Sequence, residues 1–359
     1  MKRLRMAVVG VGALGRHHAR ILSEMPGVEL VAVADPSPNG ERVAQACHCQ
    51  CIDDYRDLLT SEFKIDAVSI AVPTTFHLDV ASQFLKARIP VLVEKPLAID
   101  VDQARELCRL AAEMNVPLQV GHVERFNPAT VAAKNGCGSP KYISAERLSP
   151  YSFRSTDIGV VHDLMIHDID LVLDFVDSPV RDVHAFGMCV MGGNEDVVKA
   201  RLTFESGCIA DLTASRVNPS GSRSMQVWSP QGTTTVDFTS REVTRYAPSE
   251  TLLFGTSPLE RSQQPGANIE QLKSNVFGKF VTVDTIPVQE GDALTAELSS
   301  FANSVRTGAR PICSGEDALK AMEVADLVQR CVLAHQWDGT PSGAVGPHAT
   351  FSTPHRKAG

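Results

Sequence analysis

The sequence has no run of about 18 or more apolar residues, the length that a membrane-spanning helix needs. Lys2, Arg3 and Arg5 precede a short apolar stretch, as in a signal peptide, but glycines interrupt that stretch and no cleavage pattern follows. Basic residues are outnumbered by acidic ones, 34 to 42, so the formal net charge is −8. This balance argues against a general nucleic-acid binder. We therefore expect a cytoplasmic protein that binds neither membranes nor nucleic acids.

The sequence also lacks a disulfide pattern. Its nine cysteines are an odd number and are spread along a long chain, which favours a reducing compartment. The cluster of Cys47, Cys49 and Cys51 raises the alternative of a metal site, but zinc sites usually combine C-x-x-C pairs. The alternate spacing instead predicts that the three thiols share one face of a short strand, so we predict no metal.

What the sequence does contain is enough apolar material for two domains. Of its 359 residues, 43% are hydrophobic and 21% are charged, an ordinary balance for a globular protein. In the first third, strand-like and helix-like segments alternate, which predicts a Rossmann-type, doubly wound parallel sheet covered on both faces. The predicted strands lie near residues 6–9, 29–34, 47–51, 66–72, 90–93 and 117–121, and the helical segments near 41–46, 53–59, 74–85 and 100–114.

From about residue 122 the pattern changes. One predicted helix at 161–175 is followed by strand-like runs, which predicts an α+β domain with a large open, mostly antiparallel sheet. These runs are 180–191, 197–204, 208–217, 225–228 and 233–238, and two helices follow at 292–306 and 315–335. Residues 248–285 show no clear periodicity. We predict domains at 1–122 and 123–338 and a disordered tail at 339–359.

The clearest motif is formed by Gly10, Gly12 and Gly15, which have the spacing G-x-G-x-x-G between a strand and a helix. Gly10 permits a tight turn, Gly12 lets a pyrophosphate approach the main chain, and Gly15 allows close helix packing. The free amides and the positive dipole end of the helix would hold the phosphates. The motif predicts a dinucleotide site that includes the turn residues Ala13 and Leu14.

An acidic residue, Asp35, ends the next predicted strand. At this spacing a carboxylate accepts hydrogen bonds from the ribose hydroxyls of the dinucleotide. The same carboxylate would repel a 2′-phosphate, so the predicted cofactor is NAD rather than NADP. The alternative is that Asp35 only opens the turn Asp35-Pro36-Ser37-Pro38, because Asp is a common turn former.

Two further motifs, Pro73–His77 and Glu94-Lys95-Pro96, follow strands of the same predicted sheet. In an open parallel sheet the ligand lies beyond the carboxyl ends of the strands. We therefore predict that the cofactor site includes Pro73, Thr74, His77, Glu94 and Lys95, with Lys95 aimed into the cleft. The alternative is that Lys95 simply flanks a turn.

A second candidate constellation is Asp163 with His167, which are four residues apart in a predicted helix. This spacing places the two side chains on one face. A carboxylate beside an imidazole is a usual arrangement for a general base near neutral pH. The neighbouring apolar residues favour a buried functional pair over an acid-rich first turn with a solvent-facing His167.

Together and in this order, these motifs and Gly121-His122 resemble the glucose–fructose oxidoreductase/inositol dehydrogenase (Gfo/Idh/MocA) family over residues 1 to about 335. The resemblance implies a Rossmann domain, an open-sheet domain used for oligomerisation, and oxidation of a sugar or cyclitol hydroxyl. It implies that Lys95 hydrogen-bonds the reacting hydroxyl, that His167 accepts its proton and that Asp163 supports the pair. It also implies a homodimer or homotetramer.

Three arginine-containing stretches, residues 121–128, 147–157 and 214–217, resemble the nucleotide-sugar branch of that family. They are similar in particular to UDP-N-acetylglucosamine 3-dehydrogenases, which prepare a 3-keto sugar for an aminotransferase. The resemblance implies that Arg125, Asn127 and Arg154 bind substrate. Arginine forks suit a diphosphate, and Arg147 and Arg216 would add to them. The alternative is that at least two of the four arginines pair with acids such as Asp157 or Asp211.

The resulting hypothesis is an NAD-dependent dehydrogenase that oxidises the 3-hydroxyl of a UDP-N-acetylhexosamine. Two alternatives stay open. One is a dehydrogenase of a free cyclitol or aldose, for which uridine nucleotides would neither inhibit nor protect. The other is a catalytically silent, NAD-sensing regulator, a class that usually lacks one of the catalytic motifs.

Overall fold

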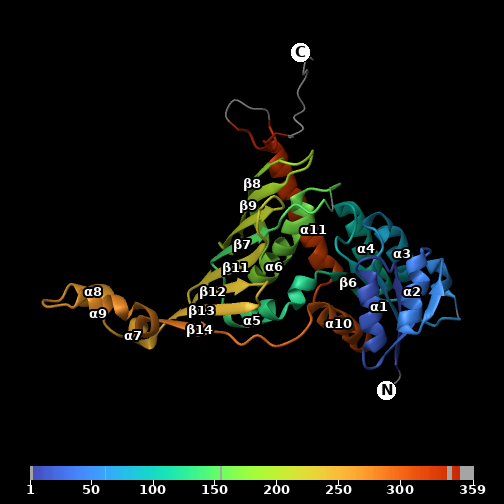
Figure 1. Ribbon diagram of the computed structural model, residues 1–359, viewed down its shortest axis with the longest axis horizontal. Coiled ribbons are helices and arrows are strands. Elements are labelled where there is room, and N and C mark those ends of the chain that lie inside the picture. The colour runs from blue at the N-terminus through green and yellow to red at the C-terminus, as the bar shows by residue number, and fades with distance from the viewer. Residues whose placement is uncertain (1–2, 61, 154–155, 338–341, 348–359) are drawn as a thin grey trace, which may run out of the picture. The chain divides into compact units, whose positions relative to one another are not determined.

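The structure, a computed structural model, describes residues 3–60, 62–153, 156–337 and 342–347. The chain divides into two compact units (Figure 1). The first unit contains residues 1–126 and 291–326, and the second contains 127–290 and 327–359. This division differs from the predicted boundaries, because residues 291–326 return to the first unit.

The first unit is built on a six-stranded parallel sheet in the order β3-β2-β1-β4-β5-β6, which confirms the predicted Rossmann fold. On β1, Met6 and Val8 point into one core, whereas Ala7 and Val9 are buried on the opposite face, because strand side chains alternate. The strands are β1 (Leu4–Val9), β2 (Val28–Ala34), β3 (Gln50–Ile52), β4 (Ala67–Ile70), β5 (Val91–Glu94) and β6 (Leu118–Gly121).

The helices of this unit begin at side-chain caps where the sequence supplies them. Ser37 accepts a hydrogen bond from the Asn39 amide at the start of α2, and Asp100 accepts one from the Gln103 amide at the start of α4. The helices are α1 (Gly15–Glu24), α2 (Pro38–Cys47), α3 (His77–Lys86), α4 (Val101–Met114) and α10 (Ala293–Thr307), with 3₁₀ turns η1 (Tyr55–Leu59), η2 (Thr74–Phe76) and η3 (Val123–Phe126).

Helix α10 explains why residues 291–326 belong to the first unit. Its Leu298, Phe301 and Ala302 are fully buried in the core that β1, β2, α1 and α2 share. Burial of a side chain such as Leu or Phe contributes about 1.5–3 kcal/mol. After α10, the chain pairs with β6, where the Val120 amide donates to the Cys313 carbonyl at 3.0 Å. Amphipathic periodicity predicts such a helix but not the sheet that it covers.

The predicted cysteine strand is wrong at its first residue. Cys47 ends α2, and His48 then adopts a left-handed conformation, with φ of 54°, which stops the helix. The thiols of Cys47, Cys49 and Cys51 nonetheless pack against the same apolar core. Burial raises the pKa of Cys49 to about 12. Across the described residues no three His, Cys, Asp or Glu side chains are grouped so that they could hold a metal ion.

The second unit is built on an eight-stranded sheet in the order β14-β13-β12-β11-β7-β10-β9-β8 (Figure 1). Only β7 and β10 pair in parallel, so the sheet is mostly antiparallel, as predicted. Strands β7, β13 and β14 were not predicted. The strands are β7 (Tyr142–Leu148), β8 (Val180–Met188), β9 (Val197–Phe204), β10 (Ile209–Ser215), β11 (Ser222–Ser229), β12 (Gly232–Asp237), β13 (Glu242–Pro248) and β14 (Val281–Thr285).

The eight-stranded sheet has one apolar face and one polar face. On β9, Val198, Ala200 and Leu202 are buried, while Lys199 and Arg201 between them are exposed. This alternation is typical of an antiparallel sheet with one solvated face. Helices α5 (Pro128–Gly136), α6 (Ile166–Val176) and the π-helical turn η4 (Val161–Met165) contact the sheet. The last helix, α11 (Gly315–Ala334), begins in the first unit and ends in the second.

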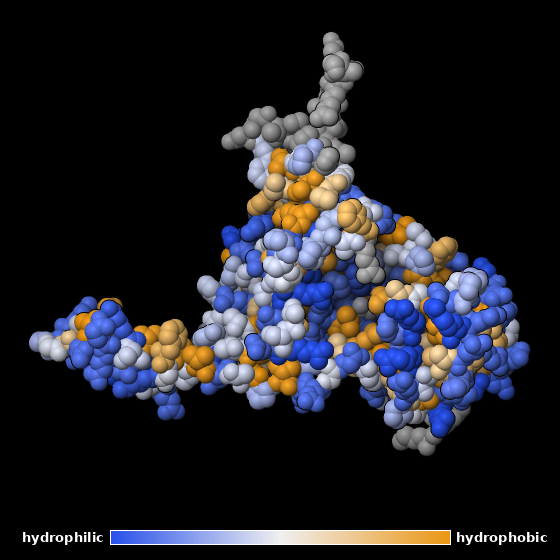
Figure 2. Space-filling view, viewed as in Figure 1, coloured by the Kyte–Doolittle hydropathy of each residue, from blue (hydrophilic) through white to orange (hydrophobic). Residues whose placement is uncertain are grey.

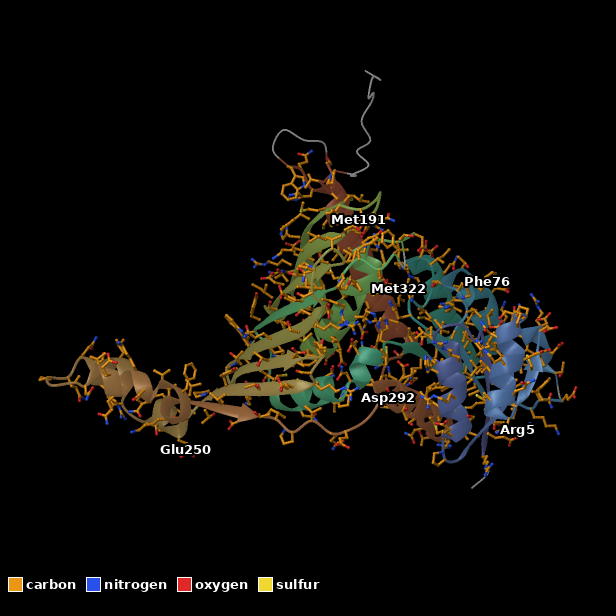
Figure 3. The ribbon with its side chains drawn as sticks, viewed as in Figure 1. Arg5, Phe76, Met191, Glu250, Asp292 and Met322 are labelled. Atoms are coloured by element: carbon orange, nitrogen blue, oxygen red, sulfur yellow. The ribbon has the colours of Figure 1, made fainter. Side chains whose placement is uncertain are left out.

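Residues 249–280, for which the sequence predicts no element, form a segment between β13 and β14 that projects from the sheet (Figure 1). It contains α7 (Glu250–Phe254), α8 (Pro258–Ser262), α9 (Ile269–Ser274) and the irregular turn η5 (Val276–Phe280). Glu250 at its start is labelled in Figure 3. No residue of α7, α8 or α9 is buried, and Phe254 is 84% exposed. Figure 2 shows apolar residues on the surface of this segment. Helices this short show too few turns for a periodicity.

Of the tail that was predicted to be disordered, the structure describes residues 342–347. Val345 pairs with the end of β8: its amide donates to the Gly187 carbonyl at 3.1 Å, and its carbonyl accepts from the Cys189 amide at 2.7 Å. This pairing differs from the predicted disorder, and residues 339–341 and 348–359 of the predicted tail lie outside the described residues. Among the helices described, none combines the length and the hydropathy of a membrane span.

Candidate active site

The glycine turn of the first unit follows β1 and is shaped by the missing side chains. Gly10 has φ of 83°, and a Cβ there would lie 2.8 Å from the Ala71 carbonyl oxygen. A Cβ on Gly15 would lie 1.9 Å from the Gly10 carbonyl oxygen. These two positions therefore require glycine for the fold itself. A Cβ on Gly12 would meet no atom within 4 Å, so that position needs glycine for another reason.

The open side of this turn fits a dinucleotide pyrophosphate. Gly12, Ala13 and Leu14 are all exposed. Helix α1 begins there with no side-chain cap and no acidic residue in its first turn. At the positive end of its dipole, therefore, no side-chain carboxylate would compete with a bound anion.

Asp35 lies at the end of β2, beside the glycine turn. Its Oδ2 accepts a hydrogen bond from the Val11 amide at 2.7 Å, and its Oδ1 accepts one from the Ser37 amide at 2.9 Å. Burial alone would raise the pKa of Asp35, but hydrogen bonds from Ser37 and Val11 hold the pKa below its ordinary value. The carboxylate stays ionised and keeps lone pairs for ribose hydroxyls. Asp35 opens the turn at residues 35–38, as the alternative prediction proposed, and its carboxylate also fits NAD.

A polar chain that the sequence reasoning missed joins this turn to the Glu-Lys-Pro loop. On α1, the Nδ1 atom of buried His18 lies 2.8 Å from the Ser69 hydroxyl, and its Nε2 lies 2.9 Å from Oε1 of Glu94. The second oxygen of Glu94 accepts the Lys95 amide at 3.2 Å. Glu94 is itself buried, and this contact holds the main chain at Lys95. A histidine on the buried face of α1, beside Ala19 and Leu22, was the available signal.

His77 was predicted to contact the cofactor, but its side chain is buried. Its two ring nitrogens lie 2.9 Å from the Pro96 carbonyl oxygen and 3.0 Å from that of Val72. Burial lowers the pKa of His77. The ring thus ties the loop after β4 to the loop that carries Lys95. Thr74 begins the 3₁₀ turn η2, and Pro73 beside it is exposed. Phe76, at the end of this turn, is labelled in Figure 3.

Asp163 and His167 lie in the second unit, where η4 passes into α6. Both are partly exposed, so the pair is less buried than predicted. The helix does not begin as a regular α-helix: its first turn is π-helical, a form that recurs at functional sites. Met165, Ile166 and Ile169 beside the pair are fully buried and fix this segment against the unit's core.

Arg147 does not present a free cation to a ligand. On β7, its guanidinium grips Asp168 on α6, with Nε 3.1 Å from Oδ2 and Nη2 2.9 Å from Oδ1. Both side chains are almost fully buried. Because Asp168 follows His167 directly, this ion pair anchors the helix that carries the predicted base.

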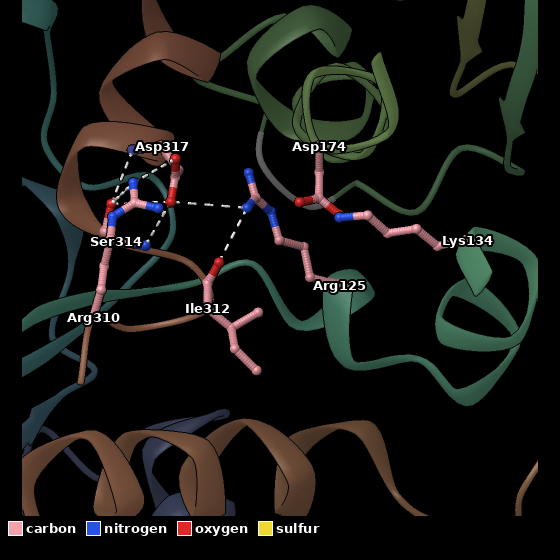
Figure 4. Close-up of polar contacts among 7 residues, drawn as sticks. All are labelled: Arg125, Lys134, Asp174, Arg310, Ile312, Ser314 and Asp317. Carbon is pink, nitrogen blue, oxygen red and sulfur yellow. Dashed lines mark hydrogen bonds and ion pairs between the residues drawn. The ribbon is translucent and has the colours of Figure 1, made fainter. Parts of the chain in front are cut away.

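Two of the other predicted arginines, Arg125 and Arg216, are also engaged. Arg125 is buried, and its Nη1 donates to the Ile312 carbonyl at 3.2 Å and lies 3.9 Å from Asp317 (Figure 4). Arg216 pairs with Asp196 at 2.7 Å. Three of the four arginines thus have carboxylate partners, as the alternative expected, but the partners are neither Asp157 nor Asp211. Arg154 lies outside the described residues.

Asn127, predicted to bind substrate, begins a helix of the second unit. Its side-chain oxygen accepts the Ala129 amide at 3.1 Å and caps α5. It is mostly buried. Like the arginines, it therefore has a structural contact that the sequence pattern did not reveal, and the family resemblance alone connects it with a ligand.

Comparison with known proteins agrees with this arrangement. Residues 4–122 match the model of an oxidoreductase family with an NAD-binding Rossmann fold, and residues 131–235 match the GFO/IDH/MocA C-terminal domain. The chain therefore belongs to the Gfo/Idh/MocA family of oxidoreductases. It is an NAD-dependent dehydrogenase that acts on CH–OH groups.

Among curated relatives, a UDP-N-acetylglucosamine 3-dehydrogenase from Acidithiobacillus ferrooxidans is 32% identical over 93% of this chain and 99% of its own length. Its solved structure matches with a TM-score of 0.79 over 92% of this chain and 98% of that one. An NAD-dependent scyllo-inositol 2-dehydrogenase from Bacillus subtilis is 27% identical over 90% of this chain and 92% of its own. An inositol 2-dehydrogenase from Rubrobacter xylanophilus is 35% identical over 52% of this chain and 56% of its own.

Proposed function

We propose that the protein oxidises the 3-hydroxyl of a UDP-linked N-acetylhexosamine to a 3-keto sugar, with NAD as the hydride acceptor. One observation carries this choice of substrate. The similarity to the UDP-N-acetylglucosamine 3-dehydrogenase reaches 32% identity across 93% of this chain, including both units. Over a comparable length, the scyllo-inositol dehydrogenase reaches 27%.

In the proposed reaction, the hydroxyl loses a proton to the imidazole of His167 as hydride leaves the same carbon. NAD, when bound, supplies the nicotinamide carbon that accepts this hydride. Lys95 hydrogen-bonds the reacting oxygen, and Asp163 supports the imidazole as it becomes positively charged. Proton removal in step with hydride departure avoids charge on the oxygen. These roles are carried over from the family resemblance, motif by motif.

The first unit supports this proposal by its construction. Asp35 stays ionised beside the glycine turn, where its carboxylate accepts hydrogen bonds from the ribose hydroxyls of NAD and would repel a 2′-phosphate. Glu94 and His18 hold the main chain at Lys95, and His77 holds the following residue, Pro96. A lysine on a loop tied at both sides is preorganised for a fixed reaction partner.

Incubation of the purified protein with NAD and UDP-N-acetylglucosamine tests the proposal. We expect NADH absorbance to rise, and a 3-amino sugar to accumulate when an aminotransferase and an amino donor trap the ketone. The trap matters because it pulls an oxidation that is otherwise reversible. NAD binding without NADH or trapped product on this sugar would overturn the proposal.

A free cyclitol is the second candidate substrate, because the inositol dehydrogenase of Rubrobacter xylanophilus is 35% identical over its matched part. A thermal-shift panel with NAD present separates the two candidates, since ligands of the native state raise its apparent stability. If the proposal holds, UDP and UDP-sugars raise the melting temperature and free inositols do not. The reverse order would favour the cyclitol.

A further inference from the structure

The π-helical turn η4 begins at a junction built on two buried carboxylates, Glu195 and Asp196, which belong neither to the family motifs nor to the proposed mechanism. Fully buried Asp196 precedes β9, and its Oδ2 accepts the main-chain amides of Val190 and Met191, each at 2.7 Å. Its Oδ1 lies 2.7 Å from Nε of Arg216. The same guanidinium donates to the Ile158 carbonyl at 2.8 Å. The loop after β8, where Figure 3 labels Met191, is thereby joined to the residues just before η4.

The neighbouring carboxylate, Glu195, lies directly at the start of the turn. Its Oε1 accepts the Val161 amide at 3.4 Å, and its main-chain carbonyl accepts the Val160 amide at 3.0 Å. Gln329 donates to its Oε2 at 3.3 Å. Glu195 is only 4% exposed. The first amides of this helical segment, which have no partner within the helix, thus bond to a single residue from a distant loop.

The fit at this junction depends on a glycine. A Cβ on Gly159 would lie 1.8 Å from Oε1 of Glu195, much closer than any two atoms that are not bonded. The carboxylate can therefore reach Val161 only because residue 159 has no side chain. The Gly159 carbonyl accepts a hydrogen bond from the main-chain amide of Asp163 at 3.1 Å. Glu195 and Gly159 are thereby connected to the residue that is proposed to support the base.

We propose that Glu195 is a positioning residue: its carboxylate fixes the start of the π-helical turn and thereby aims Asp163 and His167 at the substrate. The inference rests on the proposed function, in which His167 is the base. A buried carboxylate without partners would be strongly destabilising, and here it is satisfied by the amides that it orders. The negative charge also suits the positive end of a helical segment.

The test is the kinetics of Glu195→Ala. A catalytic group displaced by about 1 Å loses about a hundredfold in rate, so we expect kcat to fall about ten- to hundredfold. The kinetic isotope effect with substrate deuterated at the oxidised carbon rises, because chemistry becomes more rate-limiting. The Kd of NAD stays unchanged, since the glycine turn belongs to the other unit. Glu195→Gln keeps an acceptor oxygen for Val161 and restores most of kcat.

Asp211→Asn is the matched control. This carboxylate lies on β10 of the same unit, where it pairs with Arg201 of β9 and accepts a hydrogen bond from Tyr142 of β7. Its replacement leaves kcat and the isotope effect unchanged. A double-mutant cycle adds a second, independent readout. Gly159→Ala alone lowers kcat as Glu195→Ala does, but in the Glu195→Ala background it has little further effect, because the clashing carboxylate is gone.

Full kcat in Glu195→Ala, with His167→Ala inactive, would overturn the positioning role and leave the proposed function intact. A fall in kcat with an unchanged isotope effect and no rescue by Gln would also overturn it, since that pattern reports a smaller folded fraction. Failure of the wild-type protein to oxidise any sugar would instead contradict the proposed function.

Discussion

The glycine turn of the first unit and the π-helical turn of the second carry the two parts of the proposed chemistry, and they are held in different ways. The glycine turn depends on absent side chains and on one carboxylate, Asp35, that bonds to nearby amides. The π-helical turn depends on buried ion pairs and amide contacts from distant segments, through Asp168, Glu195 and Asp196. The local geometry of the glycine turn can be recognised in the sequence. For the second turn, the sequence shows Asp163 and His167 but not the distant carboxylates that hold them in place.

The largest expected effect separates the two turns by function. His167→Ala removes the proposed base, so kcat falls about 10²- to 10⁴-fold, while the Kd of NAD stays the same. Steady-state kinetics and NAD titration measure the two quantities. His184→Ala serves as a control, because His184 is an exposed histidine of the same unit. Full turnover in His167→Ala would remove the base from the proposed mechanism.

The next prediction tests whether the second turn is held by buried charge. Arg147→Ala leaves Asp168 buried without its partner, so the free energy of unfolding falls by about 3–5 kcal/mol. Arg201→Ala breaks an exposed pair with Asp211 and changes it by about 1 kcal/mol or less. Denaturant titration of both variants measures the difference. Equal losses would contradict a special role for the buried pair.

Substitutions of two glycines in the first turn separate an effect on the stability of the fold from an effect on cofactor binding. Gly15→Ala places a Cβ 1.9 Å from the Gly10 carbonyl oxygen, so stability falls by about 1–3 kcal/mol. Gly12→Ala meets no protein atom and changes stability by about 0.5 kcal/mol or less, yet the Kd of NAD rises about tenfold or more. Unaltered NAD affinity in Gly12→Ala would show that the pyrophosphate lies elsewhere.

The smallest expected effect concerns the acid dependence of stability at Asp317. Burial alone would raise its pKa, but hydrogen bonds from Ser314 and the Arg125 and Arg310 guanidinium groups lower it below the ordinary 3.8. Because the pKa is lower in the folded protein than in the unfolded chain, the ionised carboxylate stabilises the fold at any pH above the unfolded value. The advantage over Asp317→Asn, about 1–2 kcal/mol, is thus constant above about pH 5 and is lost as the pH falls below 3.8 and through the lower folded-state pKa. A difference that does not change with pH would contradict this.

The sequence predicts the parallel sheet, the mostly antiparallel sheet and most strands, because periodicity is a local property. It does not predict that α10 packs on the first sheet, since its apolar face fits any core. It wrongly places Cys47 in a strand. The helix ends at His48, which adopts a left-handed conformation, and the sequence has no glycine there to signal that end. It also suggests a diphosphate site from the charges of Arg125, Arg147 and Arg216, whose partners Asp317, Asp168 and Asp196 are distant along the chain.

A competition assay tests the central claim most directly. The protein is given NAD with equal concentrations of UDP-N-acetylglucosamine and scyllo-inositol, and the products are identified by mass spectrometry. We expect the nucleotide sugar to lose two hydrogens, at C3, while the inositol remains intact. Oxidation of the inositol with the nucleotide sugar unchanged would contradict it.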